Sequence, residues 1–544
     1  MPLSPQDVLK AVAGLCAQPN VESLTPGELK RRAEPFGART QWGSCNFVSS
    51  VKNRSAGLTV YIGSEAVRQR VLSARQREIL DNWQETVAAV LRYVRRAPLV
   101  CVERTMGQNG DFRPRCVLTV SVHRPEMCRL SHMVCQTLFE AQPEGSPVQH
   151  LVYVPEWPEM HRQMLVLPEV NVTFVLGSDY YGEAKKGFLR MAMWNAKQRG
   201  MLGLHAGSKT VRAVDMRTGK MQEIAMLFFG LTATGKTTHS CHDHGLNLPG
   251  ERTAIAQDDV VFLRPDGATL GSERGFYLKT EGLEPNSQPL IYRAATSPST
   301  IFENVLVDYQ GNVDFNDTTL TGNGRGVMQR DDFGEYKSES INTPPASEVD
   351  RCLFLFIVRR NAVVPLLAKL TPEQLAAAFM LGESVESSGG DPRRAGQTIN
   401  EVGTNPFIVG SQVAEGNRFY EMVKANGASM EGYLLNTGGV GEIVRERPEG
   451  DREVVRPALH PSVNESAALL RAVLRNTIQW EREADFGYLV PAGEMEGIDL
   501  AAYNPRRFYS EEERQRLVDH TKRDRLAWLE QFQGLEPGIV ESVK

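Results

Sequence analysis

The sequence predicts an α/β protein with two domains, the second of which begins at a phosphate-binding loop. The 544 residues exceed what one ordinary hydrophobic core holds, so we expect more than one domain. Short apolar runs typical of buried strands alternate with segments of helical periodicity. Residues 230–237 fit the pattern G-x-x-x-x-G-K-[ST] and directly follow the apolar run 224–229. We therefore divide the chain into residues 1–223 and 224–544.

The N-terminal part is expected to mix helices and strands, with no internal repeat. Strands are expected at residues 58–62, 98–103, 115–122, 148–154, 170–176 and 201–204. Helices are expected twice within residues 1–35, around a break at 25–27, and at residues 64–96, 126–141 and 188–199. Segment 37–50 is rich in Gly, Ser, Thr and Asn and is expected to be a loop.

The C-terminal part continues the same mixture. Strands are expected at residues 224–229, 253–262, 276–280, 301–307, 351–357 and 432–439. Helices are expected at residues 370–381, 462–479 and 511–533, the last opened by a capping box of Ser510 and Glu513. Segment 383–400, full of Ser, Gly and Arg, is a candidate lid.

Composition and charge are those of a soluble globular protein, with 41% hydrophobic and 23% charged residues. A net charge of −5 gives no reason to expect nucleic acid or an anionic membrane as a partner. No apolar run approaches the ~18 residues that span a bilayer, and the N-terminus lacks the features of a signal peptide. The eight cysteines are scattered without a C-x-x-C, so we expect reduced thiols and a cytoplasmic protein.

The segment around the phosphate-binding loop combines a strand, a glycine turn and a helix start in the order that phosphate binding needs. Gly230 and Gly235 let the backbone turn tightly, so that its N–H groups point at phosphate oxygens. Lys236 would reach the terminal phosphates, and the Thr237 hydroxyl would ligate a nucleotide-bound divalent ion. We expect nucleotide contacts from Gly230, Leu231, Thr232, Ala233, Thr234, Gly235, Lys236, Thr237 and Thr238.

Other positions admit two interpretations each. Asp258 and Asp259 suit the second acidic element that holds a metal beside the phosphates; the alternative is a pair of loop aspartates. Lys185 and Lys186 open a predicted helix, where two cations are unfavourable unless a ligand shares the site. His205 follows a predicted strand, where a lone histidine is more often a core residue than a metal ligand.

A second group of metal-ligand types follows the phosphate-binding loop. It consists of His239, Cys241, His242, Asp243 and His244. A zinc site is one interpretation, but the spacing fits no common pairing of ligand doublets. Surface histidines on the helix under the loop are the favoured account.

One arginine stands out before the predicted strand at 58–62. Arg54 lies in a loop of small residues, where its planar fork could grip a carboxylate. An arginine in such a loop is usually just solvated, so the residue carries little weight alone.

Together these motifs resemble those of the ATP-dependent phosphoenolpyruvate carboxykinases. The matching segments are the phosphate-binding loop at 230–237, Tyr-x-Gly-Glu-x-Lys-Lys-Gly at 180–187, His205, Asp-Asp at 258–259, Tyr-x-Lys-Thr at 277–280, Glu-Asn-Val at 303–305, Thr-x-Asn-x-Arg at 321–325 and Asn-Thr-Gly at 436–438. The resemblance covers about residues 50–445. Apart from the loop no single motif is specific, whereas the ordered set is.

The resemblance implies a two-domain phosphoenolpyruvate carboxykinase-like fold, with an N-terminal substrate-binding domain and a C-terminal nucleotide-binding domain. It implies that ATP and oxaloacetate give phosphoenolpyruvate, CO₂ and ADP, as in gluconeogenesis or anaplerosis. It implies that Lys186, His205 and Asp259 hold Mn²⁺ and that Lys236 and Thr237 hold Mg²⁺ and the phosphates. Arg54 would orient the substrate carboxylate, and Tyr180 would lie beside the enolate or CO₂. Arg325 and Lys279 would act at the transferring phosphoryl group, and Asn436 and Thr437 would lie on the nucleotide side.

The chain departs from the family pattern in three places. Only Arg54 and Ser55 remain of the family's arginine loop, and Arg39 competes for the same role. Ala233 replaces a glycine of the phosphate-binding loop, and the residues after Asp259 differ. Two alternatives therefore stay open: a kinase that phosphorylates another molecule without decarboxylation, and a non-catalytic nucleotide-binding regulator. The sequence leaves the oligomeric state open.

Overall fold

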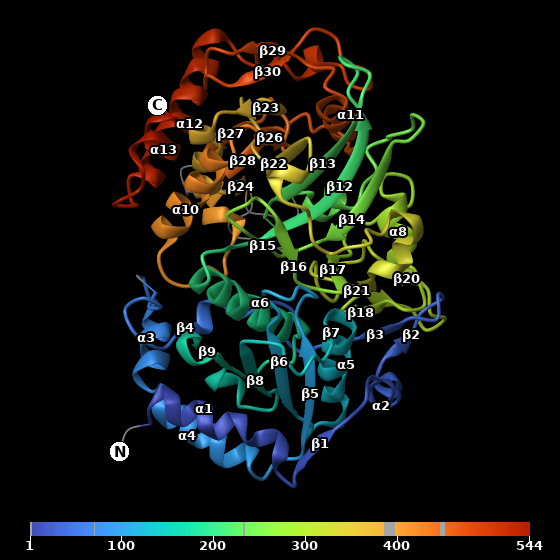
Figure 1. The fold of residues 1–544 in the computed structure, drawn as a ribbon, viewed down its shortest axis with the longest axis vertical. Coiled ribbons are helices and arrows are strands. Elements are labelled where there is room, and N and C mark those ends of the chain that lie inside the picture. The colour runs from blue at the N-terminus through green and yellow to red at the C-terminus, as the bar shows by residue number, and fades with distance from the viewer. Residues whose placement is uncertain (1–2, 70, 232–233, 386–397, 447–451) are drawn as a thin grey trace.

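The computed structural model describes residues 3–69, 71–231, 234–385, 398–446 and 452–544. It is a mixed α/β structure with several sheets, as the alternation of apolar runs and helical segments predicts. The N-terminal elements gather in the lower part of Figure 1 and the C-terminal elements in the upper part. Helix α6 and the strands β15 to β18 and β21 lie between them.

The N-terminal sheet has the strand order β1-β5-β6-β8-β10-β9-β4, with β7 paired to β5. Its strands are β1 (Val21–Ser23), β4 (Thr59–Tyr61), β5 (Leu99–Thr105), β6 (Arg115–Ser121), β7 (Phe139–Glu140), β8 (Val148–Val154), β9 (Gln163–Leu167) and β10 (Val172–Leu176). Its helices are α1 (Pro5–Ala13), α2 (Pro26–Ala33), α3 (Ala74–Asp81), α4 (Trp83–Val94), α5 (Cys128–Thr137) and α6 (Tyr181–Gln198). Alternate strand residues serve two cores, one shared with α1 and α4 and the other with α5 and α6.

The C-terminal sheet has the order β14-β12-β13-β22-β26-β23-β30-β29. Its strands are β12 (Ala206–Val214), β13 (Met221–Phe229), β14 (Arg252–Gln257), β22 (Arg351–Val358), β23 (Leu367–Leu370), β26 (Met430–Asn436), β29 (Gln479–Arg482) and β30 (Leu489–Ala492). The helices that follow are α9 (Pro372–Leu381), α10 (Gln412–Ala425), α11 (Val463–Leu474), α12 (Glu511–Leu529) and α13 (Pro537–Glu541). α9 and α10 pack on one face of the sheet and α11 on the other. β13 leads into the phosphate-binding loop from the middle of this sheet.

Smaller sheets join the two parts. One has the order β17-β21-β18-β3-β2, so strands from the start of the chain pair with strands about 250 residues later. The remaining elements are β2 (Ala38–Arg39), β3 (Cys45–Phe47), β11 (Leu202–Leu204), α7 (Lys236–Ser240), β15 (Val261–Leu263), β16 (Thr269–Gly271), β17 (Gly275–Lys279), α8 (Pro289–Ala295), β18 (Ile301–Glu303), β19 (Leu306–Val307), β20 (Val313–Asp314), β21 (Arg325–Gln329), β24 (Glu383–Val385), β25 (Thr398–Asn400), β27 (Ile443–Glu446) and β28 (Arg452–Arg456).

Several predicted elements differ in extent. The expected loop 37–50 contains the short strands β2 and β3, and the expected helix 64–96 is two helices, α3 and α4, that start only at Ala74. The helix expected from residue 188 begins at Tyr181, which places Lys185 and Lys186 in its second turn rather than before it. The expected strand 253–262 is interrupted at the two aspartates. The lid candidate 383–400 begins and ends as the hairpin β24–β25, and the rest lies outside the described residues.

The expectation of reduced thiols is wrong for one pair of cysteines. Cys16, just after α1, forms a disulfide with Cys101 on β5. The other six cysteines are free and buried, in agreement with the prediction. The pair is separated by 85 residues, so the sequence carries no local sign of it.

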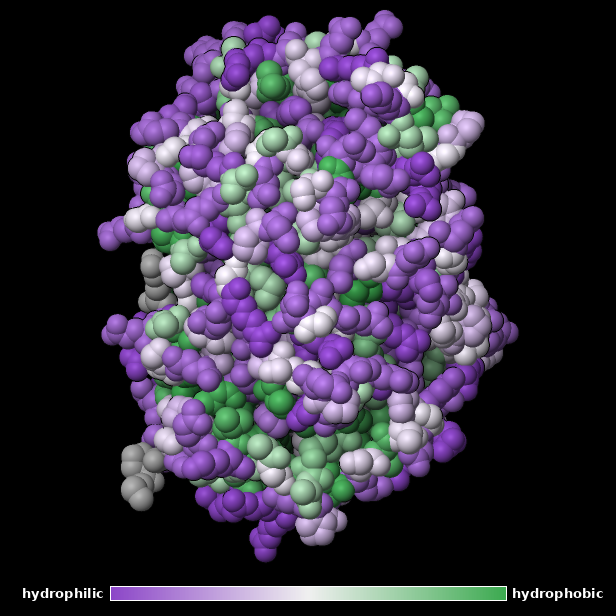
Figure 2. All heavy atoms as spheres, viewed as in Figure 1, coloured by the Kyte–Doolittle hydropathy of each residue, from purple (hydrophilic) through white to green (hydrophobic). Residues whose placement is uncertain are grey.

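Hydrophilic residues dominate the face of the molecule in Figure 2, and hydrophobic areas gather mainly at its lower, N-terminal end. Among the described residues, every helix is too short or too polar to cross a membrane.

A buried ion pair ties helix α12 to the hairpin β24–β25. The Nε and Nη2 groups of Arg525 donate to the two carboxylate oxygens of Glu383 over 2.8 and 2.7 Å. The side chains of the pair are only 2% and 3% exposed. Burial opposes the ionisation of Glu383, but Arg525 and Arg360 outweigh it and lower its pKa to about 2. The charge of Glu383 therefore depends on its arginine partners.

Replacing Arg525 with Met is expected to lower the free energy of unfolding by about 3–5 kcal/mol, because Glu383 is left buried without its cation. The folded pKa lies below the ordinary value of 4.5, so the contribution is complete above about pH 4.5 and is lost as the pH falls towards 2. Chemical denaturation at pH 7 and pH 3 should show a smaller difference from the wild type at pH 3. Arg523→Met, an exposed change on the same helix, should cost less than about 0.5 kcal/mol. Equal losses in both variants would contradict this account.

Candidate active site

Side chains from α6, from α7 and from the link between β11 and β12 meet at Asp259, in the break between β14 and β15. Its carboxylate lies 2.5 Å from Lys186 Nζ, 2.9 Å from His205 Nε2 and 3.0 Å from Lys236 Nζ, and it also accepts from Lys185. Burial opposes the ionisation of Asp259, but the three ammonium groups outweigh it and hold its pKa well below its usual value. The carboxylate is therefore the common partner of the whole cluster.

Lys185 and Glu273 form a buried ion pair next to this cluster. The Lys185 side chain is fully buried and donates to Asp259 and, over 2.8 Å, to Glu273 Oε2. Burial raises the pKa of Glu273 to about 7, against the attraction of Lys185. Because Lys185 has two acidic partners, its pKa is raised despite burial. Lys185 is therefore a structural cation, and it shares the Oδ2 atom of Asp259 with its neighbour Lys186.

Lys186, His205 and Asp259 have the chemistry of a metal site. His205 Nδ1 lies 2.5 Å from the carbonyl oxygen of Thr404, which can only accept, so Nδ1 carries the proton and Nε2 presents a lone pair. Burial lowers the pKa of His205 to about 3, so at neutral pH two acceptors, Nε2 and Asp259 Oδ1, face each other at 2.9 Å. Burial lowers the pKa of Lys186 to about 7, although Asp259 opposes this, so a neutral amine is accessible. This set of two nitrogens and an oxygen suits a divalent cation.

The predicted phosphate-binding loop, residues 230–237, runs from β13 into the short helix α7. A side chain at Gly230 would not fit, since a Cβ there would lie 2.3 Å from Thr234 Oγ1. Gly235 has the left-handed φ of 105° and leads directly into α7. Lys236 at the start of the helix reaches Asp259. Of the expected nucleotide contacts, Thr232 and Ala233 lie outside the described residues.

Two other residues of the predicted loop region have partners in the structure. The Thr234 hydroxyl donates to the Leu231 carbonyl over 2.8 Å, and the Thr238 hydroxyl donates to Gln288 over 3.1 Å. Thr237, next to Lys236, is partly exposed. The Asp258 carboxyl is buried, which raises its pKa, and its Oδ1 has no hydrogen-bond partner in the described part of the chain.

His239 within α7 and His244 after it are buried, so the expectation of surface histidines is wrong for these two. His239 and His244 are 2% and 0% exposed. Lys209 on β12 reaches under α7 and donates to the carbonyl oxygens of His239 and His242 over 2.9 and 2.7 Å. Its Nζ also lies 2.6 Å from His244 Nε2. Among the described residues no three His, Cys, Asp or Glu side chains form a metal-binding group, so the zinc alternative is not supported.

Tyr180 and Arg325 belong to one hydrogen-bonded group. Arg325 donates from Nε and Nη2 to Asn323 Oδ1 over 3.0 and 2.7 Å. Asn323 in turn donates from Nδ2 to the Tyr180 hydroxyl, and Tyr277 donates to the same hydroxyl, each over 3.1 Å. The Arg325 guanidinium also lies over the Tyr277 ring, 5.3 Å from its centroid. Asn323 thus connects Tyr180 and Arg325, two of the predicted site residues, through hydrogen bonds.

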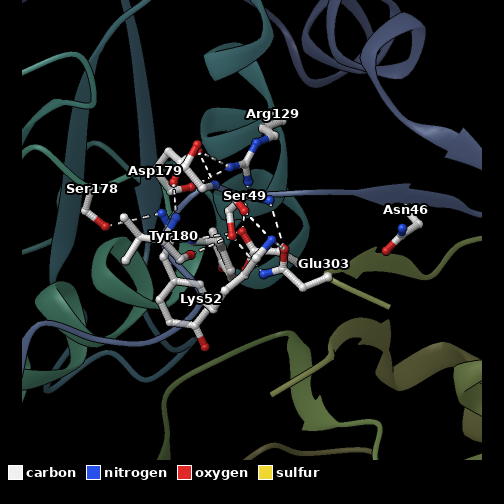
Figure 3. Close-up of polar contacts among 12 residues, drawn as sticks. Asn46, Ser49, Lys52, Arg129, Ser178, Asp179, Tyr180 and Glu303 are labelled. Carbon is white, nitrogen blue, oxygen red and sulfur yellow. Dashed lines mark hydrogen bonds and ion pairs between the residues drawn. The ribbon is translucent and has the colours of Figure 1, made fainter. Parts of the chain in front are cut away.

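A buried charge network fixes the start of α6 and the loop before β4 (Figure 3). Arg129 donates from Nη1 to Glu303 Oε1 over 2.8 Å, and Asp179 lies 3.7 Å from its other terminal nitrogen. The Asp179 carboxylate accepts the backbone N–H of Ser50 over 2.8 Å. In Figure 3 the ring of Tyr180 points away from this network. The network therefore holds the backbone, while the phenol lies outside it and is bonded to Asn323 and Tyr277.

Arg54 and Arg39 lie in different surroundings. The Arg54 guanidinium packs on the Phe407 ring at 4.4 Å, and Lys186 Nζ lies 4.7 Å from the same ring. Arg39 is 59% exposed in its side chain, pairs with Glu34 at 3.4 Å and donates to a carbonyl oxygen within its own turn. Phe407 therefore links Arg54 to the Asp259 cluster.

Three further residues were predicted to contact the nucleotide, and each has a different kind of partner in the structure: Lys279, Asn436 and Thr437. Lys279 is paired with Glu281. The Asn436 amide is buried and bonded to backbone groups, including the carbonyl oxygens of Arg360 and Val364, so it shapes a loop. The Thr437 hydroxyl donates over 2.9 Å to the Thr234 carbonyl and so touches the phosphate-binding loop.

Sequence reasoning missed three residues around the site. Glu273, Lys209 and Phe407 stand in no motif, and their roles come from contacts across at least 30 residues of chain. Lys185 was noted beside Lys186, but its burial and its pairing with Asp259 and Glu273 were not predicted.

Comparisons with known proteins find relatives along nearly the whole chain. A family model described as Phosphoenolpyruvate carboxykinase matches residues 15–500. The chain is similar to the protein named "Phosphoenolpyruvate carboxykinase (ATP)" of Aeropyrum pernix, with 32% identity over 533 residues, which is 96% of this chain and 97% of that protein. Proteins of the same name from Rhizobium rhizogenes and Mesorhizobium japonicum are 26% and 28% identical, each over 62% of this chain and 57% of their own length.

Proposed function

The chain belongs to the family of ATP-dependent phosphoenolpyruvate carboxykinases and converts oxaloacetate to phosphoenolpyruvate with ATP, and we propose how its residues divide this work. The observation that carries the proposal is the shared carboxylate of Asp259. Its Oδ2 faces Lys186 and its Oδ1 faces both His205 and Lys236 of the phosphate-binding loop. One residue therefore joins the proposed metal ligands to the proposed phosphate-binding residues.

Loss of CO₂ from oxaloacetate leaves an enolate, whose oxygen must be stabilised. We assign Lys186, His205 and Asp259 as ligands of Mn²⁺, which supplies a positive charge beside that oxygen when bound. The pKa of about 7 for Lys186 and the lone pair on His205 Nε2 support this set. Tyr180, held by Tyr277 and Asn323, would lie beside the enolate or the departing CO₂. Arg54 would orient the substrate carboxylate.

Phosphoryl transfer needs positive groups around the phosphates, because negative charge is spread over the moving group. We assign Lys236 to the terminal phosphates and Thr237 to Mg²⁺. The Oδ1 atom of Asp258 has no hydrogen-bond partner among the described residues, which supports a cation site here. Arg325 would neutralise charge on the transferring group. Lys279 would assist once released from Glu281.

The nucleotide would contact the loop residues Gly230 to Thr238 and Thr437, with Asn436 fixing the turn that carries Thr437. We propose a substrate-binding domain at residues 1–223 and a nucleotide-binding domain at 224–544. β12 comes before this boundary yet pairs along its length with β13, so the domains share that sheet. We further propose that the protein works in the cytoplasm on small molecules.

A coupled assay for ADP and CO₂ tests this function. The wild type is expected to release both products in equal amounts only when oxaloacetate, ATP and the divalent ions are present. Lys236→Ala is expected to abolish turnover, because Lys236 supplies the positive charge of the loop itself beside the terminal phosphates. The exposed Lys220→Ala is the matched control and should leave the rate unchanged. ADP release without CO₂ would instead support a kinase that does not decarboxylate.

Arg54→Lys tests the carboxylate contact, since an ammonium group cannot offer two parallel donors. Losing a charged hydrogen bond should cost about 2–4 kcal/mol, or roughly 30- to 1000-fold in kcat/KM. We expect a higher KM for oxaloacetate and an unchanged KM for ATP in steady-state kinetics. Arg39→Lys should do little, because Arg39 is exposed and paired with Glu34. Sensitivity at Arg39 alone would mean that the wrong arginine has been assigned.

A further inference from the structure

Arg190 is a buried cation that no proposed role uses. It lies on α6 one helical turn after Lys186, so the two side chains leave the same face of the helix. Arg190 is only 3% exposed. Its Nε is buried and has no hydrogen-bond partner among the described residues. A buried guanidinium without such partners is costly, so its position calls for an explanation.

Two aromatic rings line the place where this guanidinium lies. Its Cζ is 5.8 Å from the centroid of Tyr61 and 5.9 Å from that of Phe407. Phe407 is also the ring on which Arg54 packs at 4.4 Å and which Lys186 approaches at 4.7 Å. Three cationic side chains therefore surround one phenyl ring at the edge of the Asp259 cluster.

The carboxyl groups nearby balance this charge only in part. Glu183 attracts Arg54 and also accepts the backbone N–H of Ser55 over 2.5 Å. Burial raises the pKa of Glu401 to about 7, so this group is only partly ionised at neutral pH. Burial lowers the pKa of Arg54 against the attraction of Glu183, and the repulsion by Arg190 lowers it further. An anionic ligand with two charges would relieve the repulsion between the guanidinium groups.

We propose that Arg190 is a second carboxylate-binding residue, which holds the carboxylate that oxaloacetate has and phosphoenolpyruvate lacks. The inference rests on the proposed function, because it assigns a further residue to the same substrate site. Arg54 takes the carboxylate that both molecules share, and Arg54, Lys186 and Arg190 all lie within 6 Å of the Phe407 ring. The two arginines would thus hold the two ends of a small dicarboxylate.

The aromatic rings around Arg190 suit the conversion of that carboxylate to CO₂. When the bond to the neighbouring carbon breaks, its electron pair stays on the carbon as the enolate forms, and the carboxylate leaves as neutral CO₂. The guanidinium of Arg190 attracts the charged group, while the rings of Tyr61 and Phe407 tolerate the neutral product. Because this charge disappears during the reaction, Arg190 stabilises the bound substrate more than the transition state. Its removal should therefore raise KM without lowering kcat.

Arg190→Met keeps the length of the side chain and removes its charge. We expect the KM for oxaloacetate to rise about 10- to 100-fold, with kcat within about threefold of the wild type. The Kd of phosphoenolpyruvate, measured by calorimetry, should change less than about threefold. Arg190→Lys should restore part of the oxaloacetate KM. Arg199→Met, an exposed change at the end of the same helix, should leave all three values unchanged.

Two results would overturn the proposal. Equal weakening of oxaloacetate and phosphoenolpyruvate would place Arg190 at the shared carboxylate or in a merely structural role. No change for either ligand, in a variant whose thermal unfolding is that of the wild type, would leave Arg190 without a part in binding. If Arg190→Met does not fold, the same comparison of the two ligands is made with Arg190→Lys. Failure of the wild type to turn over oxaloacetate would be a separate result, against the proposed function itself.

Discussion

The site depends on one constraint: a single buried carboxylate, Asp259, must balance several buried cations. Lys185, Lys186 and Lys236 all reach it, and His205 faces it with a lone pair. Buried charges are stable only when they are paired, so none of these side chains can move without affecting the others. Binding of a divalent ion at Lys186 and His205 would draw on the same carboxylate that now holds Lys236. The proposed metal site and the phosphate-binding lysine are therefore electrostatically coupled.

The fold explains how these groups meet. β14 and β15 stop on either side of the two aspartates, which leaves Asp259 at the edge of two sheets. α6 brings Lys185 and Lys186 from the N-terminal sheet, and α7 brings Lys236 from the C-terminal sheet. The Arg129, Glu303 and Asp179 network in turn fixes the start of α6. The cluster thus lies where the two parts of the chain meet, and its geometry depends on both.

Much of the fold and of the candidate site could be predicted from the sequence, because strands and glycine turns have recognisable local patterns. The strand before Gly230, the loop pattern and the order of the motifs singled out Lys236, Asp259 and His205, which the structure brings together. The start of α6 was misplaced because Gly182 and Gly187 lower helix propensity. In the structure both are needed for packing, since a Cβ at Gly187 would lie 2.6 Å from Leu151. Helix propensity was overridden by close contact with β8.

Long-range pairings were beyond sequence reasoning. The disulfide of Cys16 and Cys101, the burial of His239 and His244, and the grouping of Arg54 and Arg190 around Phe407 join segments far apart in the chain. Residue type alone also misleads, since Lys209 and Arg190 are of kinds that usually lie at the surface. Their roles follow only from what the folded chain places around them.

The most direct test of the account is the affinity of the Asp259→Asn variant for Mn²⁺ and for ATP–Mg²⁺, measured by calorimetry beside its thermal unfolding. The account predicts that Mn²⁺ affinity falls at least about 100-fold, because an amide oxygen replaces the only charged ligand. Affinity for ATP–Mg²⁺ should stay the same or rise, since Lys236 is freed from its carboxylate partner. A folded variant that binds Mn²⁺ as tightly as the wild type would contradict the central role of Asp259.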